Sequence, residues 1–226
     1  KGGTQPIIGT QIIFKFEDQE GLLTLIAKNE QGYRKMIELS SKSYLENDNL
    51  SKPHCKLNDL FNKNEGLIIM SGTINGLIGN LFNKGKFELI EDIYKKLKNY
   101  YEDNFYIEIQ RLGNSNYRLN ENSILNLAND HHVPLVATND VYFEGPEYYE
   151  AHDALMCIEK KLYVSQLDRN KLSSEHYFKS QEEMSELFID LPEAINNTLE
   201  IAQRCSHRPN TKMPILPVVD KDLDNE

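Results

Sequence analysis

The chain has 226 residues, of which 39% are hydrophobic, and this is enough for one large domain or two small ones with a buried core. Its 35 acidic residues outnumber 25 Lys and Arg, and the formal net charge of -10 argues against a free-standing nucleic-acid binder, which usually presents a basic surface. No apolar run approaches the ~20 residues of a membrane-spanning helix. Three cysteines without CxxC spacing argue against a disulfide framework or a cysteine-based zinc knuckle, and they fit a reducing cytoplasm.

The first third of the sequence predicts a β-hairpin, a helix and a short buried strand. Two apolar, β-branched runs are separated by the polar turn 17–21, which is typical of two paired strands. From Glu30 the apolar residues recur at helical spacing. In chain order, the expected elements are strands over 6–16 and 22–27, a helix from 30, an exposed connection over 44–56, one or two helical turns over 57–61 and a strand over 66–71.

The middle of the sequence alternates helices with strands. Apolar residues from Phe87 to Tyr101 recur every three or four positions, which predicts a long amphipathic helix. The run 105–110, FYIEIQ, alternates as a half-buried strand does, a helix continues over 124–128, and the run 133–138, VPLVAT, predicts a fully apolar strand. This order of elements is typical of an α/β protein with mostly parallel strands.

The last third predicts two closing helices and a linker. Ser180 with Glu183, and Asp190 with Glu193, each match a capping box, so a helix is expected to begin after each. The tail 209–226 contains prolines and an acidic end, which predicts a linker.

Functional residues of α/β proteins gather at the carboxyl ends of parallel strands, and four stretches qualify here: 9–11, 71–73, 110–113 and 138–142. Only Asp140 offers a carboxylate at the end of a strongly predicted strand, whereas a metal site needs several converging ligands. A capping role in its own loop suits Asp140 at least as well as a ligand role.

The histidines do not form a trio with metal-ligand spacing. The tripeptide Asp130-His131-His132 matches a signature of a phosphoesterase family that binds two metals, but it falls between a predicted helix and a predicted strand. A surface turn with a histidine near a helix C-terminus is therefore the favoured interpretation. His152 lies on a predicted helix, where a lone histidine usually packs or caps. The other three lie in polar loops: His54, His176 and His207.

The chain resembles the polymerase-and-histidinol-phosphatase (PHP) domain of the bacterial DNA polymerase III alpha subunit in the segments PIIGTQ, EGLIIMSG, FYIEIQR, VPLVATNDVYF and EAHDALMCI, taken in order. The helical stretch YFKSQEEMSELFIDLPEAINNTLEIAQRC resembles the segment that follows in that family, and MPILP resembles its exit toward the polymerase palm. The resemblance runs from Pro6 to about Pro217.

This resemblance implies an α/β fold, a distorted seven-stranded barrel wrapped by helices. The family's first strand carries a His-x-His pair, and the chain begins after that place. We therefore expect a fragment whose barrel is incomplete, with the first βα units missing. Residues 1–208 are expected to form the partial PHP domain, and residues 209–226 the linker toward the polymerase palm and thumb.

The resemblance also allows the family's metal-site positions to be compared one by one, because active members carry a trinuclear metal site at one mouth of the barrel. The chain keeps Asp140 but has Gln11 in place of Glu, Thr73 in place of Cys, Leu112 in place of His and Tyr142 in place of His. An amide is a poorer ligand than a carboxylate, and a hydrocarbon is none. We therefore expect a vestigial site with no bound metal and no catalytic residue.

The resemblance implies a parent protein that is a DNA-directed DNA polymerase, a nucleotidyltransferase of DNA replication in the cytoplasm. This fragment is expected to be a non-catalytic scaffold that docks the proofreading exonuclease subunit. Other partners would be the remaining polymerase III holoenzyme subunits, and DNA through other domains, with no membrane. Magnesium would belong to the polymerase site outside this sequence. The alternative is a metal-dependent PHP phosphoesterase or 3'-5' exonuclease that uses Asp140 with ligands from the missing first strand.

Overall fold

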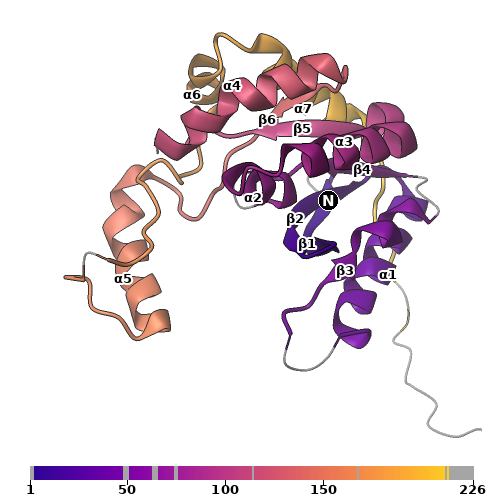
Figure 1. Ribbon diagram of the computed structural model, residues 1–226. Helices are drawn as coiled ribbons and strands as arrows, with labels where there is room; N and C mark the ends of the chain where they lie inside the picture. The colour runs from indigo at the N-terminus through magenta and orange to yellow at the C-terminus, as the bar shows by residue number, and fades with distance from the viewer. Residues whose placement is uncertain are drawn as a thin grey trace, which may run out of the picture.

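The computed structural model describes residues 3–47, 51–62, 66–73, 76–113, 115–166, 168–211 and 213, and for 115–120 the backbone alone. Figure 1 shows a sheet with helices packed around it and one helix, α5, that stands apart. The strands are β1 (Ile8–Phe16), β2 (Gln19–Ala27), β3 (Cys55–Lys56), β4 (Leu67–Met70), β5 (Phe105–Ile109) and β6 (Leu135–Ala137). The α-helices are α1 (Glu30–Leu45), α2 (Leu77–Asn83), α3 (Phe87–Tyr101), α4 (Ser115–Asp130), α5 (Tyr149–Lys160), α6 (Gln181–Leu187) and α7 (Pro192–Arg204). Short 3-10 helices cover Leu57–Phe61, Glu102–Asn104 and Pro146–Tyr148.

The six strands form one mixed sheet in the order β3-β1-β2-β4-β5-β6. The predicted hairpin is confirmed, because β1 and β2 pair antiparallel from Ile8–Ala27 to Phe16–Gln19. The pairs β1/β3, β4/β5 and β5/β6 are parallel, whereas β2 also runs antiparallel to β4. Within the described residues β3 and β6 are the edges of an open sheet, which is consistent with an incomplete PHP-type α/β barrel.

One of the four predicted strand ends lies elsewhere. Residues 9–11 are inside β1, which continues for five further residues to Phe16. The other three stretches follow β4, β5 and β6. These three strands are mutually parallel, so their carboxyl ends lie at one edge of the sheet.

The strand β5 is buried along its whole length, so the prediction of a half-buried strand is wrong. Phe105, Ile107 and Ile109 pack into the main core with α3 and α4. Tyr106 faces the other way and packs with residues of β4, β6 and α7 in a second, smaller cluster, which contains Ile68, Met70, Tyr106, Val136, Ile201 and Cys205. Side-chain types alternate along β5 because its two faces pack against different clusters, but both faces are covered.

The helices bear out most of the periodic patterns. The predicted stripe of α3 is buried at Ile90, Ile93, Tyr94, Leu97 and Tyr101. α1 begins at the N-cap Asn29, whose side chain accepts a hydrogen bond from Gly32 N (3.1 Å). Gly32 has to be glycine because a Cβ there would collide with the carbonyl of Gly66.

The two predicted capping boxes have different outcomes. Ser180 and Glu183 form the predicted box at the start of α6. The second prediction is wrong: Leu191 is the N-cap of α7, without a side-chain hydrogen bond, and Pro192 occupies the first helical turn. Asp190 instead accepts hydrogen bonds from the guanidinium of Arg111.

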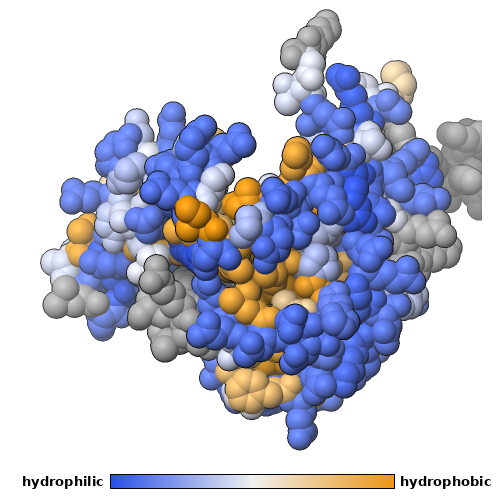
Figure 2. All heavy atoms as spheres, turned by 90° about the horizontal axis from the view of Figure 1, so that it is seen from above, coloured by the Kyte–Doolittle hydropathy of each residue, from blue (hydrophilic) through white to orange (hydrophobic). Residues whose placement is uncertain are grey.

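The outer surface is mainly hydrophilic, and Figure 2 shows on one face an apolar hollow ringed by hydrophilic residues. None of the helices in the described part of the chain has the length and apolar character needed to cross a membrane. The three cysteines, Cys55, Cys157 and Cys205, are buried and free.

Candidate functional site

The carboxyl ends of β4, β5 and β6 carry a polar cluster, which we call the strand-end cluster. It contains the buried residues Ser71, Glu108 and Gln110 and the half-buried Thr138. The backbone N–H of Glu108 donates to Ser71 Oγ (3.1 Å), so the first two members are joined across β4 and β5. Thr138 Oγ1 donates to Glu108 Oε1 (2.6 Å) and accepts from Gln110 Nε2 (3.0 Å), which joins β5 to the residue after β6. The cluster therefore binds three neighbouring strands together where they end.

Glu108 is the acid at the centre of this cluster, and its side chain is buried. Burial raises the pKa of the Glu108 carboxyl, the Thr138 hydroxyl opposes the rise, and the nearby Asp140 adds to it. Sequence reasoning missed Glu108. The available signal was a glutamate within the otherwise apolar run FYIEI of a core strand.

Asp140 lies half-buried just beyond β6, as its position in the sequence predicts. Burial raises the pKa of the Asp140 carboxyl, and His176 opposes the rise. His176 lies in a loop, as predicted, but it is buried, and burial lowers the pKa of its imidazole although Ser173 and Asp140 oppose this. Asp140 thus has a histidine beside it that the chain pattern did not indicate.

Leu112 is linked to this histidine through Ser173, and Tyr142 contacts it directly. Leu112 is 0% exposed, and its carbonyl accepts a hydrogen bond from Ser173 Oγ (2.6 Å). Ser173 Oγ also lies 3.0 Å from His176 Nδ1. The backbone N–H of Tyr142 donates to His176 O (2.9 Å), and the phenol ring packs 5.5 Å from the His152 ring. Three of the five compared positions, Leu112, Asp140 and Tyr142, therefore lie around His176.

Gln11 and Thr73 are engaged in other contacts. Gln11 is exposed on β1, and its Nε2 donates to Thr24 Oγ1 on β2 (3.3 Å). Thr73 is half-buried in the turn after β4, where its carbonyl accepts from Gly76 N (2.8 Å). Gly72, with φ of +73°, makes this tight turn possible.

The five positions do not fit a trinuclear metal site. They offer one carboxylate, one amide, one aliphatic hydroxyl, one phenol and one hydrocarbon. In the described part of the chain, no group of three or more His, Cys, Asp or Glu side chains converges on a point where an ion could be held. No catalytic step through a metal follows from this donor set.

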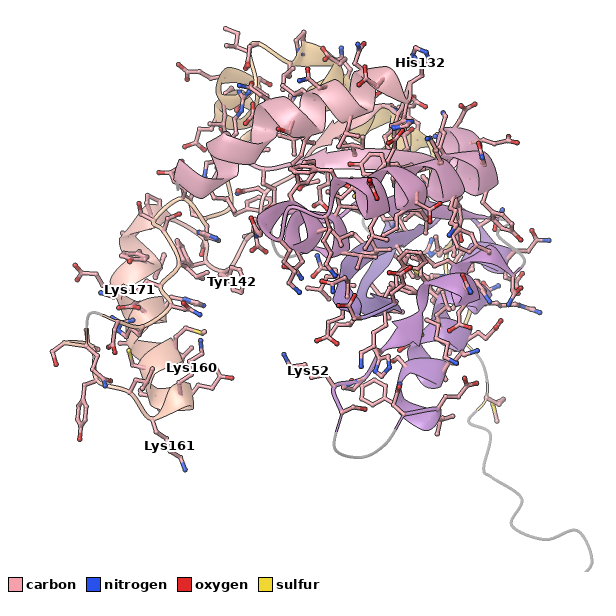
Figure 3. The ribbon with its side chains drawn as sticks, viewed as in Figure 1. Lys52, His132, Tyr142, Lys160, Lys161 and Lys171 are labelled. Carbon is pink, nitrogen blue, oxygen red and sulfur yellow. The ribbon has the colours of Figure 1, made fainter. Side chains whose placement is uncertain are left out.

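The Asp130-His131-His132 tripeptide lies away from the strand-end cluster, where α4 ends and the chain enters β6. His132 is exposed with φ of +51°, and Figure 3 shows it on the outer surface, while Tyr142 lies near α5. His131 packs its ring 6.1 Å from Tyr94. The two histidines have different surroundings, which agrees with the predicted surface turn and not with a shared two-metal cleft.

The sequence of the chain matches a known domain family and known proteins. Residues 1–112 match the PHP domain family. The chain is 42% identical to the DNA polymerase III subunit alpha of Caulobacter vibrioides over 223 residues, which is 95% of this chain and 20% of that protein. It is 38% identical to the subunit of Rickettsia bellii over 220 residues, with 96% of this chain and 19% of that protein covered. It is 37% identical to the subunit of Borreliella burgdorferi over 230 residues, with 96% and 20% covered.

The chain thus spans about a fifth of the length of the curated relatives that it matches. The domain boundary at residue 208 stays a prediction, and most of the predicted linker 209–226 lies outside the described residues. The open mixed sheet is consistent with these matches: the chain belongs to the PHP domain family, in the form found in DNA polymerase III alpha subunits.

Proposed function

We propose that this chain works in DNA replication as part of a polymerase III alpha subunit, as a non-catalytic scaffold to which the proofreading exonuclease subunit docks. Its similarity to alpha subunits over 95% of its length supports the replication role. The remaining holoenzyme subunits would be further partners. Nucleotidyl transfer with magnesium, and contact with DNA, would belong to other domains. The protein would act in the cytoplasm.

The observation that carries the non-catalytic role is the buried hydrocarbon at Leu112. The family resemblance puts a histidine ligand there, whereas the Leu112 side chain is completely buried and offers no donor atom. Asp140 is the one carboxylate retained among the five positions, and a single carboxylate does not hold a metal cluster.

The docking role is tested by binding. A polymerase polypeptide that contains residues 1–208 should form a complex with its proofreading subunit in size-exclusion chromatography and calorimetry. The same polypeptide without these residues should lose that complex. Undiminished binding after the deletion would refute docking on this domain.

The alternative, a PHP phosphoesterase or 3'-5' exonuclease, makes the opposite prediction for metal content. Elemental analysis and a phosphatase assay on the subunit should find neither stoichiometric zinc or manganese nor turnover from this domain. Asp140→Ala should then leave metal content and phosphatase turnover unchanged, as should the control Glu159→Ala on the exposed face of α5. Stoichiometric metal with turnover abolished by Asp140→Ala alone would establish the alternative.

A further inference from the structure

Two buried oxygen atoms of the strand-end cluster have no hydrogen-bond donor among the residues that the structure describes. They are Oε2 of Glu108 and Oε1 of Gln110, and these side chains are 6% and 9% exposed. The residues stand two positions apart where β5 ends, so both side chains lie on the same face of the sheet. Buried polar atoms are almost always paired, so two orphaned acceptors side by side call for a missing donor.

Within the described part of the chain, the donors that reach this cluster are already used. Thr138 Oγ1 gives its proton to Glu108 Oε1, and Gln110 Nε2 gives one to Thr138 Oγ1. The second contact of Gln110 Nε2, with Glu108 Oε1, is long at 3.4 Å. An ionised carboxylate can only accept hydrogen bonds, whereas a protonated one carries a donor of its own. A protonated Glu108 carboxyl supplies the hydrogen-bond donor that the cluster lacks.

The charges that face Glu108 do not favour its ionised form. The ionisable group that acts on it from the chain after β6 is Asp140, which is itself an acid. His176 interacts with Asp140 and is not among the groups that shift the pKa of Glu108. On the face covered by α7, Glu200 and Arg204 are bound to the hydroxyl of Tyr106. On the β4 side, Ser71 contributes a neutral hydroxyl.

We infer that Glu108 is a neutral carboxylic acid in the folded chain at neutral pH, and that loss of its proton loosens the edge of the sheet where β4, β5 and β6 end. This goes beyond the proposed scaffold role, because it makes the geometry of that edge depend on proton binding. An ionised Glu108 would be a buried charge without a counter-charge, which a fold relieves by opening to water.

The sign of the pH dependence follows from the direction of the shift. Burial raises the pKa of Glu108 in the folded chain above the unfolded value of about 4.3, so the folded state binds more protons than the unfolded state. Stability is therefore undiminished below about pH 4.3 and falls as the pH rises toward the folded pKa. The folding equilibrium constant should fall about tenfold for each pH unit in that window.

Two measurements test this inference. The first is NMR titration of the Glu108 side-chain carboxyl carbon in the labelled chain, assigned through bonds from the backbone. Its signal should stay in the protonated position while exposed glutamates ionise. The second is urea denaturation of Glu108→Gln, a neutral variant of the same shape. Relative to the unchanged chain, its folding constant should rise about tenfold per pH unit above about pH 4.3, and the control Glu159→Gln should follow the unchanged chain.

Each outcome decides the inference. A Glu108 signal that titrates with the exposed glutamates overturns it, even if Glu108→Gln does not fold. An unaltered pH dependence in Glu108→Gln also overturns it. Adding magnesium or zinc should leave the protonated signal in place; if either ion converts it to the ionised position, a cation and not a proton is the natural occupant. Docking of the proofreading subunit is measured separately, so failure here is distinguishable from failure of the proposed function.

Discussion

The helices α3 and α5 are both amphipathic, but they are held in the molecule in different ways. α3 buries five side chains in the main core, from Ile90 to Tyr101. α5 buries one, Cys157, and leaves Leu155 and Ile158 61% and 75% exposed. Figure 1 shows α3 packed on the sheet and α5 away from it.

The segment that carries α5 is tied together by polar and aromatic contacts in place of a core. Arg169 makes a double ion pair with Asp153 on α5. The ring of Phe143 lies 5.5 Å from His152. An amphipathic pattern thus predicts that a helix has an apolar face, but the pattern does not say whether the rest of the chain covers that face.

The largest expected difference between the two regions comes from the same substitution made in each. Leu97→Ala on α3 removes a side chain that is 0% exposed in the main core, and it should cost about 3 kcal/mol of unfolding free energy. Leu155→Ala on α5 should cost less than about 0.5 kcal/mol because that side chain is already in water. Urea denaturation of both variants checks this, and equal losses would contradict the comparison.

The next largest effect is expected from loss of the Arg111 ion pairs, which lie outside the segment that carries α5. Arg111 donates to Glu121 Oε1 (2.5 Å), Leu187 O (2.7 Å) and Asp190 Oδ1 (2.6 Å), and it lies over the Phe188 ring at 4.8 Å. Arg111→Ala should cost about 2 kcal/mol, because it leaves the mostly buried Glu121 carboxylate without its counter-charge.

The control for that prediction is Arg34→Ala on α1. Arg34 pairs with Glu30 one helical turn away, and both side chains are exposed, so its loss should cost less than about 0.5 kcal/mol. A similar loss for both arginines would mean that the Arg111 contacts add nothing beyond an ordinary surface pair.

A smaller loss of stability is expected at Ser180, the N-cap of α6, which follows the segment that carries α5. Ser180 Oγ accepts from Glu183 N (3.2 Å), and Glu183 Oε2 accepts from Ser180 N (2.7 Å). Ser180→Ala should cost about 1 kcal/mol, because it removes the cap of α6. Ser185→Ala, which alters a hydroxyl within the same helix, should be close to neutral by comparison when urea midpoints are measured.

The sequence predicted those parts of the fold that depend on neighbouring residues. The stripe of α3, the hairpin of β1 and β2 and the box at Ser180 each follow from spacings of a few positions. The second box was wrong because two other effects prevail: Pro192 fixes where α7 begins, and Asp190 is bound by Arg111, which is 79 residues away.

The candidate site was less accessible from sequence because its contacts are distant along the chain. Asp140 could be placed after β6 from its motif alone. Glu108 could not be linked to Thr138, 30 residues further on, until the register of β5 and β6 was known. His176 looked like a loop residue, since nothing nearby in sequence indicates that it is buried beside Asp140. The roles of Gln11, Thr73, Leu112 and Tyr142 remain predictions from the family resemblance.

Lowering the pH should destabilise α5 before it destabilises α3. The Arg169 guanidinium holds the pKa of Asp153 below its usual range, and both side chains are largely shielded, at 4% and 11% exposed. A carboxyl with a lowered pKa contributes stability above its unfolded value of about 3.9, and this contribution is lost as the pH falls through the lowered value. α5 should therefore loosen in acid before α3 does, because α3 is held by five buried apolar side chains and its ion pairs with Lys95 and Lys96 are exposed. Amide hydrogen-exchange protection followed from pH 6 to pH 2.5 should be lost first in α5, and Arg169→Ala should lower protection there at pH 6. If α3 and α5 change together in both experiments, the α5 segment is not a separate unit of stability, and its ion pair does not hold it in place.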